Sequence, residues 1–433
     1  MNECYYKEKI NQLIEDIKKE KFIPQFCANI KSPDKSKTYY SGPLFDNEEL
    51  VEAIYTLLFG RWLVAGEKVN QFEKEFSKVV NVQYSLMVNS GSSANIVIIS
   101  ALKKYFEWND GDEIIISVVG FPTTLSPIIQ NNFKPVFLDI ELDTLNFDIS
   151  SLEKYITPKT KAILVSPVLG NPPDMTLLET VCKKHGIYII MDCCDSLGSK
   201  WMGKSLFEYG VMSSCSFYPA HHITTGEGGM VSSNNEELIK LSRSFAWWGR
   251  DCYCVGPANL LKNGSCNCRF ARWINELNFE IDHKYFYTNV GYNLKPLDLQ
   301  GAIGLAQLKK LDFIHNKRVE YKNKIQSILS KIKSVSFPIQ LKYAEVSWFG
   351  VPIICDSYAS KKKLVTYLED NGIQTRNYFA GNMLIHPAFR DLDDWKKYPN
   401  ANLVLERVFF IGCSPTMTDE NIEHIEEVVS KYE

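Results

Sequence analysis

The sequence predicts an α/β protein with a mainly parallel, doubly wound sheet in a large domain and a smaller α+β domain at the C-terminus. Short apolar runs rich in β-branched residues alternate with helical segments over about two hundred residues, which is typical of a parallel sheet with crossover helices. From about Leu305 the pattern changes to a long helix, a strand-like SWFGVPIIC and a last helical segment, which predicts the second domain.

The individual elements follow from their patterns. Residues 1–45 predict a helical N-terminal arm, and residues 48–80 predict further helices. Short apolar runs bounded by turn residues, as in strands buried on both faces, predict strands at residues 113–117, 134–140, 161–168 and 188–192. LLETVCKKHG, between the last two, is an amphipathic crossover helix that ends in glycine. The large domain is then 46–304, with a cysteine-rich loop at about 250–270, and the small domain is 305–433.

Composition excludes several functions. The chain has 433 residues, 45% of them apolar, and a net charge of −3 with its Lys and Arg scattered, so we expect neither a nucleic-acid nor a membrane partner. The N-terminus has no apolar stretch with a cleavage site, and no later run reaches the length of a membrane span, so a cytoplasmic protein is expected. Twelve cysteines in such a chain favour metal or cluster ligation over disulfides.

The stretch VNSGSSANIVIISAL predicts a phosphate site. Small residues precede an apolar helical run, so the backbone N–H groups of Gly91, Ser92 and Ser93 are expected to be free at a helix N-terminus. The alternative is an ordinary N-cap.

Asp192 ends the strand-like YIIMD. A carboxylate at this strand end can bind the protonated pyridine nitrogen of a pyridoxal-type cofactor and keep its ring an electron sink. The alternative is an acid that caps the following turn.

The stretch SFYPAHHITTGEGG resembles the cofactor-lysine motif of sugar aminotransferases that act on nucleotide-linked keto sugars, with His221 at the lysine position. The resemblance extends from SGPLFDNEELVEAI to SWFGVPI and TRNYFAGN. It implies the pyridoxal-phosphate (PLP) family of sugar aminotransferases and dehydrases, with the aminotransferase fold of type I.

The resemblance also implies roles for residues of this chain. Gly91, Ser92, Ser93 and Ser216 would hold the cofactor phosphate, and Asp192 its ring nitrogen. Phe121 would stack on the ring, although ordinary core packing is its alternative. Asp195 would lie near the cofactor hydroxyl. Asn293 would reach the phosphate of the neighbouring subunit, which implies a homodimer with shared active sites.

Histidine in place of lysine changes the chemistry. A lysine amine forms an internal Schiff base and permits transamination, whereas imidazole cannot form that bond but can still move a proton. The cofactor would therefore be held noncovalently, as pyridoxamine phosphate (PMP), and His221 would be the base that drives loss of the sugar's C3 hydroxyl. The adjacent His222 is expected to be structural.

The cysteines distinguish two kinds of lysine-lacking dehydrase in this family. Between Cys194 and Cys252 lie 57 residues, and Cys252 and Cys254 form a Cys-x-Cys pair. This resembles the iron-sulfur CDP-4-keto-6-deoxyglucose 3-dehydrases and implies a [2Fe-2S] cluster held by Cys194, Cys252, Cys254 and Cys266, with Cys268 as an alternative last ligand. A zinc site made of Cys252, Cys254, Cys266 and Cys268 is the other possibility, although one-residue spacing suits zinc poorly.

The implied function is removal of the C3 hydroxyl from a nucleotide-linked 4-keto-6-deoxy sugar, such as the CDP-linked glucose derivative, to supply 3,6-dideoxyhexoses for lipopolysaccharide O-antigen. The implied electron donor is an NADH-dependent iron-sulfur flavoprotein reductase or a ferredoxin. Three alternatives stay open: a cluster-free, glutamate-using dehydratase that resembles those acting on GDP-4-keto-6-deoxymannose, a true aminotransferase, and a noncatalytic cofactor-binding scaffold. The nucleotide is not assigned by the sequence.

Overall fold

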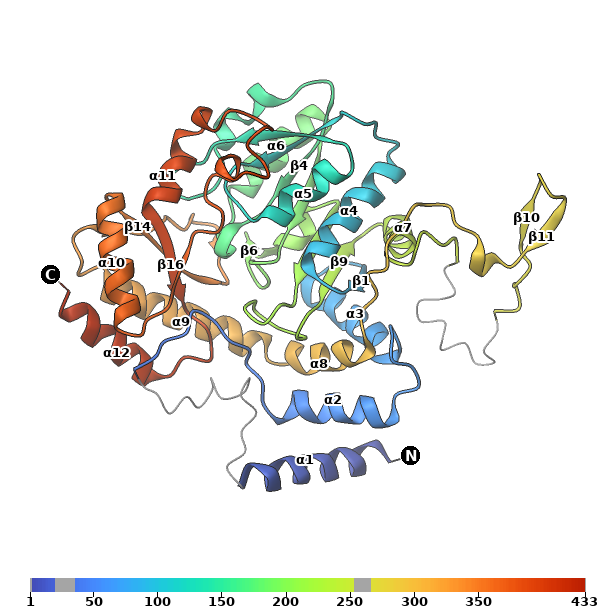
Figure 1. The fold of residues 1–433 in the computed structure, drawn as a ribbon, viewed down its shortest axis with the longest axis horizontal. Helices are drawn as coiled ribbons and strands as arrows, with labels where there is room; N and C mark the ends of the chain where they lie inside the picture. The colour runs from blue at the N-terminus through green and yellow to red at the C-terminus, as the bar shows by residue number, and fades with distance from the viewer. Residues whose placement is uncertain (1, 20–35, 253–265, 433) are drawn as a thin grey trace.

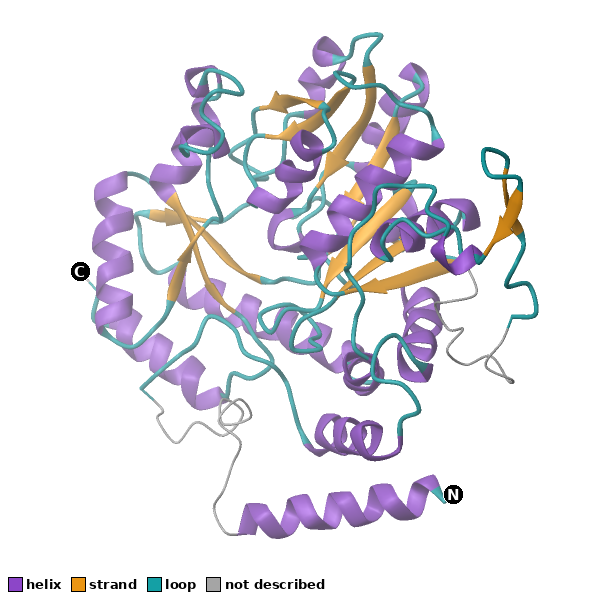
Figure 2. Ribbon diagram, turned by 45° about the vertical axis from the view of Figure 1, so that its right-hand side comes forward, coloured by secondary structure: helices purple, strands orange, loops and turns teal. Residues whose placement is uncertain are grey.

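The computed structural model describes residues 2–19, 36–252 and 266–432. Its centre is a seven-stranded sheet with helices packed on both sides, and a smaller four-stranded sheet lies beside it with its own helices (Figures 1 and 2). The sheet of the large domain and the smaller α+β unit that the fold class predicts are therefore both present. No helix among the described residues is long and apolar enough to cross a membrane.

The large sheet confirms the predicted parallel architecture. Its strand order is β1-β9-β8-β5-β4-β2-β3, and only β9 runs against its neighbours. Four of its strands are those expected from the apolar runs. The bounds are β1 Tyr84–Val88, β2 Glu113–Ser117, β3 Lys134–Leu138, β4 Thr160–Val165, β5 Tyr188–Asp192, β8 Met212–Ser216 and β9 Gly229–Ser233.

Helices of the large domain begin and end where their sequences allow. In α6 (Met175–His185), Asp174 caps the first turn, and Gly186 ends the helix in the left-handed conformation at φ +65°, as the terminal glycine predicted. The other helices are α3 Glu67–Val80, α4 Gly91–Tyr105, α5 Pro122–Gln130 and α7 Glu236–Ala246.

The N-terminal arm contains helix α1 (Glu3–Lys19), which packs on α2 (Asn47–Phe59) through Ile10, Ile14 and Val51. Residues 20–35 of the predicted arm lie outside the described residues.

The long helix expected from Leu305 is two helices, α8 (Asp298–Leu308) and α9 (Leu311–Leu329), so that prediction is wrong. The turn between them is fixed by a tertiary contact, because Lys310 Nζ lies 2.7 Å from an oxygen of the fully buried Glu49 carboxylate. No glycine or proline marks the break, so a pattern of apolar residues could not predict it.

The small domain is built on an antiparallel sheet of order β12-β14-β16-β15. Its bounds are β12 Val335–Ser336, β14 Gly350–Cys355, β15 Thr375–Asn377 and β16 Val408–Gly412, with helices α10 Tyr358–Asp370, α11 Pro399–Arg407 and α12 Asp419–Ser430. This agrees with the α+β domain predicted after Leu305.

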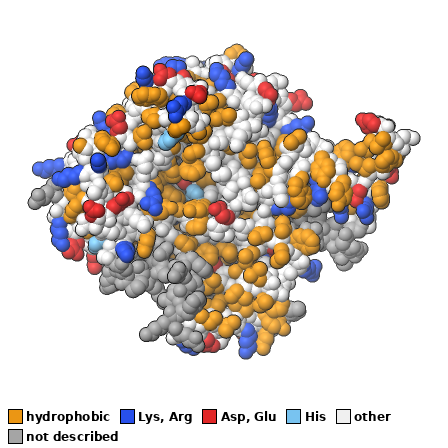
Figure 3. Space-filling view, in the orientation of Figure 1, with side chains coloured by type: hydrophobic (Ala, Val, Ile, Leu, Met, Phe, Trp, Pro, Cys, Tyr) orange, Lys and Arg blue, Asp and Glu red, His pale blue; other side chains and the backbone are white. Residues whose placement is uncertain are grey.

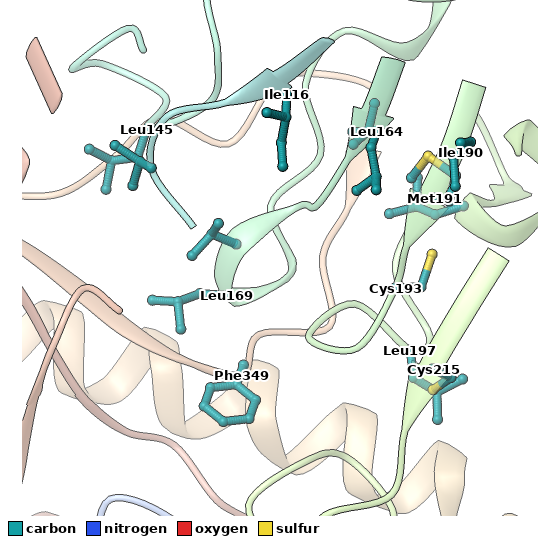
Figure 4. Packing of buried hydrophobic residues seen from close by; sticks show 14 of the residues in the cluster. Ile116, Leu145, Leu164, Leu169, Ile190, Met191, Cys193, Leu197, Cys215 and Phe349 are labelled. Atoms are coloured by element: carbon teal, nitrogen blue, oxygen red, sulfur yellow. The ribbon is translucent and has the colours of Figure 1, made fainter. Parts of the chain in front are cut away.

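One hydrophobic core runs through both sheets. Ile116, Leu164 and Ile190 lie next to one another on three adjacent strands, and Phe349 of the small domain lies beside Leu169 (Figure 4). Two small elements complete the fold: a sheet of β13 Ala344–Glu345, β6 Lys200–Trp201 and β7 Lys204–Ser205, and a hairpin of β10 Arg272–Ile274 and β11 Phe279–Ile281 that stands away from the body (Figure 1).

Candidate active site

The expected cofactor residues meet where β5, β8 and the N-terminus of α4 come together. Strand β5 ends at Asp192 and its neighbour β8 ends at Ser216, which places both at the carboxyl edge of the sheet. Helix α4 begins against this edge so closely that a Cβ added to Gly91 would lie 2.5 Å from Ser216 Cβ and 2.9 Å from Cys194 Sγ. Segments distant in the sequence therefore form one cradle.

The start of α4 is a capped helix N-terminus. Ser90 is the N-cap, and its hydroxyl accepts the backbone N–H of Ser93 at 3.0 Å. The prediction that the Ser93 amide is free is therefore wrong, because a serine N-cap satisfies that donor. The amides of Gly91 and Ser92 belong to the first turn of the helix, where no earlier helical carbonyl can pair with them. They remain the hydrogen-bond donors of this cradle.

Asp192 is a buried carboxylate with four donors. Its side chain accepts hydrogen bonds from Asn95 Nδ2 and Thr124 Oγ1, both at 2.8 Å. It also accepts hydrogen bonds from Ser214 Oγ and from the backbone N–H of Cys194, both at 3.2 Å. It is only 4% exposed, and among the described residues no lysine, arginine or histidine nitrogen lies within 4.0 Å of it. A buried carboxylate without a cation is costly, so the site suits a ligand that brings a protonated nitrogen. This is the property that a pyridoxal-type cofactor requires.

His221 faces Asp195. His221 Nδ1 lies 3.5 Å from Asp195 Oδ1 and has no hydrogen-bond partner among the described residues. The pKa of His221 falls to about 4, mainly because the side chain is buried; the charge of Asp192 opposes this fall, and the positive charge of Arg318 adds to it. Burial, followed by the charge of Asp192, raises the pKa of Asp195 to about 7. His221 is therefore neutral near pH 7, the form that can accept a proton.

His221 is held from its backbone and its ring. Its N–H donates to Tyr218 O at 2.9 Å, and its ring centroid lies 5.3 Å from that of Phe349. Arg318 of α9, only 1% exposed, donates to the carbonyl oxygens of His221 at 3.3 Å and Phe349 at 2.9 Å. The adjacent His222 is 3% exposed and its Nε2 pairs with the Ser347 carbonyl, in agreement with the structural role expected of it.

Phe121 lies at the mouth of the cradle. It is the N-cap residue of α5 and is 51% exposed, so it is not an ordinary core residue. Its ring meets that of Phe379 edge to face, with centroids 6.0 Å apart. Phe379 has a φ of +46°, unusual for a large side chain and typical of backbone held at a binding site. Stacking of Phe121 on a cofactor ring stays a prediction.

Asn293 is exposed on a loop beside the cradle. The carbonyl oxygen of the next residue, Leu294, accepts a hydrogen bond from the backbone N–H of Asn89 at 3.0 Å, two residues before α4 begins. The side-chain oxygen of Asn293 accepts a hydrogen bond from Lys295 Nζ. Its role toward a neighbouring subunit stays a prediction.

The predicted cluster ligands are not assembled by the described residues. Cys194 lies against the cradle, Cys252 is buried, and Cys266 Sγ lies 3.1 Å from His283 Nε2, while Cys254 lies outside the described residues. In the part of the chain that the structure describes, no three His, Cys, Asp or Glu side chains form a possible metal site. The three described cysteines therefore do not fit a metal centre by themselves. Burial raises the pKa of the Cys194 thiol, which favours its protonated form.

Sequence reasoning missed the residues that support the site. Asn95 and Thr124 lie inside the two motifs already singled out, and Ser214 is the cross-strand partner of Asp192. Knowledge of the strand order would have indicated Ser214. Arg318 gave no signal, because an arginine in a charged helix normally faces solvent.

Comparison with known proteins agrees with this geometry. Residues 45–430 match the model of the DegT/DnrJ/EryC1/StrS aminotransferase family. The chain is 36% identical to the lipopolysaccharide biosynthesis protein RfbH of Salmonella typhimurium, over 99% of this chain and 97% of that protein. It is 34% identical to the dTDP-4-dehydro-2,6-dideoxy-D-glucose 3-dehydratase of Saccharopolyspora spinosa, over 98% and 92% of the two chains.

A solved structure is also similar. The Escherichia coli GDP-4-keto-6-deoxy-D-mannose-3-dehydratase with bound hydrated PLP superposes with a TM-score of 0.79 at 28% identity, over 90% of this chain and 98% of that one. The chain belongs to the DegT/DnrJ/EryC1/StrS aminotransferase family and has the type I fold of its PLP-dependent sugar dehydratases and aminotransferases.

Proposed function

We propose that this protein is a PMP-dependent 3-dehydratase that removes the C3 hydroxyl from a nucleotide-linked 4-keto-6-deoxy sugar. The observation that carries the proposal is the neutral, buried His221 beside Asp195, where a transaminating enzyme needs a lysine. Two similar proteins are named as 3-dehydratases of dTDP-linked and GDP-linked sugars, which supports the reaction but leaves the nucleotide open. We propose the CDP-linked glucose derivative first, on the cysteine spacing described above.

PMP, when bound, supplies an amine that condenses with a keto group and a ring that withdraws electrons. The buried Asp192 would pair with the protonated ring nitrogen, and the donors from Asn95, Thr124 and Ser214 keep its carboxylate in place. The first amides of α4 and the Ser216 hydroxyl would bind the phosphate.

The imidazole of His221 would take a proton from the carbon made acidic by that ring and deliver it to the departing C3 hydroxyl. Because its pKa is lowered, the imidazole is unprotonated at neutral pH and can accept a proton, and Arg318 and Phe349 fix its backbone and ring. Histidine cannot hold the cofactor covalently, so noncovalent contacts alone would keep it in the site.

The experiment is turnover by the His221→Asn variant of the cofactor-loaded protein, with CDP-, GDP- and dTDP-linked 4-keto-6-deoxy sugars as separate substrates. We expect loss of C3 dehydration by about 100-fold or more with cofactor retained, because only the proton acceptor is removed. His424→Asn, at an exposed histidine that pairs with Asn371 O, is the control. A wild-type protein that removes the C3 hydroxyl from none of the three sugars would leave the cofactor-binding scaffold.

We further propose a [2Fe-2S] cluster on Cys194, Cys252, Cys254 and Cys266, supplied with electrons by an NADH-dependent iron-sulfur flavoprotein reductase or a ferredoxin. The support is the spacing of these cysteines, and because the described cysteines do not form a site alone, no step is assigned to the cluster. Anaerobic iron and sulfide analysis of the native chain and Cys252→Ser is the test. Iron-free native protein would favour the glutamate-using dehydratase, which the similarity to the GDP-linked enzyme also supports.

We also propose that the protein acts as a homodimer. Exposed apolar side chains gather over the lower face in Figure 3, around α1, α2 and α8. At the C-terminal end of α2 and just after it, Leu58 and Leu63 are each 65% exposed and Trp62 is 49% exposed. A soluble chain rarely leaves such a patch uncovered, so a second copy is its expected partner.

A further inference from the structure

Two cations and a tryptophan form a cluster that the proposed chemistry does not use. Lys295 Nζ lies 3.3 Å from the centroid of the Trp248 ring, and Arg250 Cζ lies 4.6 Å from the same centroid. Trp248 is 39% exposed and has a φ of +63°, which a large side chain rarely adopts. Such backbone strain persists only where the surroundings hold it.

The surroundings of Trp248 do hold it. The Trp248 amide donates to Tyr292 O at 2.6 Å, and the Thr288 amide donates to Gly249 O at 2.9 Å. The two backbones are so close that a Cβ on Gly249 would lie 1.8 Å from Asn289 O, and one on Gly291 would lie 2.2 Å from Gly249 N. Only glycine fits these two positions, so the loops that carry the cations are locked together.

Lys295 and Arg250 both place a positive charge at the ring of Trp248. Among the described residues neither Lys295 nor Arg250 has a carboxylate oxygen within 4.0 Å, and the neighbouring Asp251 pairs with Arg272 instead. Residues 253–265 contain no Asp or Glu that could supply one. Burial, followed by the charge of Arg250, lowers the pKa of Lys295 to about 8. Two cations at one ring, neither with a carboxylate partner among the described residues, fit an anion from outside the chain.

The group of Lys295, Arg250 and Trp248 is next to the cofactor cradle. Leu294, which precedes Lys295, accepts the amide of Asn89, and Ser90 is the N-cap of α4. Asn293 and Lys295 also pair through their side chains. An anion held by the two cations would therefore lie beside the cradle, where the nucleotide end of the substrate would extend.

We propose that Lys295 and Arg250, positioned by Trp248, bind the diphosphate of the nucleotide-linked substrate. This inference rests on the proposed function. A diphosphate brings two adjacent negative groups, which match two cations, and an arginine can bind phosphate oxygens through two N–H donors. The cofactor phosphate is the other candidate anion, but the first amides of α4 and Ser216 already provide a site for it.

The test measures nucleotide binding rather than turnover. Calorimetric titration of PMP-loaded protein with CDP, GDP and dTDP, each used alone, is compared for wild type, Lys295→Gln and Arg250→Gln. We expect each variant to weaken the best-bound nucleotide by about tenfold or more, because a charged hydrogen bond to phosphate is lost. Lys295→Arg should keep most of the affinity. Lys184→Gln, at a surface lysine that pairs with Glu153, is the matched loss of charge.

Each other outcome has a distinct meaning. Unchanged nucleotide affinity in both glutamine variants would overturn the inference and leave the proposed function intact. Weaker cofactor binding with unchanged nucleotide affinity would also overturn it, because the pair would then hold the cofactor phosphate. Wild-type protein that binds none of the three nucleotides would count against the proposed function itself. Melting temperatures of all variants identify any affinity lost through unfolding.

Discussion

His221 and Asp195 change each other's environment because both are buried. In the unfolded chain both groups would be charged between about pH 4 and 6.5, whereas burial favours the neutral form of each in the folded chain. Asp192, which lies close to both, stabilises a charged His221 and destabilises a charged Asp195. A bound cofactor with a protonated nitrogen would offset the negative charge of Asp192. We therefore expect cofactor binding to change the pKa values of both His221 and Asp195.

Their pKa shifts predict opposite effects of pH on stability. The pKa of Asp195 rises from 3.8 to about 7, so the folded state holds a proton that the unfolded state has released, and stability falls as pH rises from about 4 to 7. The pKa of His221 falls from 6.5 to about 4, so stability rises with pH over about 4 to 6.5. The two slopes nearly cancel in the wild type.

Asp195→Asn should remove one slope and expose the other. We expect the free energy of unfolding of cofactor-free Asp195→Asn to gain on that of the wild type as pH rises from about 4 to 7, by up to about 4 kcal/mol in total. Urea unfolding at pH 4.5, 6 and 8 measures it, with the exposed Asp391→Asn as control. A difference that is constant across this pH range would mean that Asp195 titrates normally in the folded chain.

A residue of the site could be predicted from the sequence when a single local motif defines its role. His221 and Asp192 were found because a register and a strand end define them. Ser214 and Arg318 were not, because their roles arise from a cross-strand pair and from a helix of the other domain. Contacts of this kind exist only after the strand order is known.

At the scale of elements, the cradle depends on the approach of α4 to β9. A Cβ on Gly229, the first residue of β9, would lie 2.1 Å from Ser90 O and 2.6 Å from the Gly91 amide. The strand therefore supports the N-terminus of the helix from behind. The position of the phosphate donors is set by a glycine that no ligand needs to touch.

Gly229→Ala should damage both stability and cofactor binding. The methyl group must displace the backbone at Ser90, so we expect a loss of about 1 to 3 kcal/mol in the free energy of unfolding and weaker binding of PLP. Gly120→Ala is the control, since its Cβ would meet only Met383 Cε, at 3.9 Å. Denaturant unfolding and absorbance titration with PLP measure the two effects. Equal behaviour of the two variants would show that α4 can shift without harm.

Helices and strands could be predicted from the sequence where local burial determines them, and not where tertiary contacts do. The central strands are buried on both faces, so their apolar runs are continuous and their bounds agree with the sequence within a few residues. The break between α8 and α9 depends on Lys310 and Glu49, which are far apart in the chain. The hairpin β10–β11 has exposed side chains on a short ribbon, and its pattern gave no signal.

At the scale of the whole molecule, Asn293 and His221 have different surroundings in one chain. His221 is enclosed by Asp195, Phe349 and Arg318, whereas Asn293 is exposed on a loop. If the exposed apolar face around Leu58 and Leu63 joins two copies, each active site can take its base from one chain and Asn293 from the other. This arrangement can be tested by complementation.

We expect His221→Asn and Asn293→Ala to be poorly active as separate homodimers, Asn293→Ala by about tenfold, because a phosphate contact is lost. Co-expression with two affinity tags yields a hybrid dimer in which one site has both defects and the other has both native residues. That hybrid should recover about half of the wild-type turnover. A doubly tagged dimer with His221→Asn in both chains is the control. A hybrid no more active than the Asn293→Ala dimer would show that His221 and Asn293 serve the same chain, and a wild type that sedimentation shows to be monomeric would exclude shared sites.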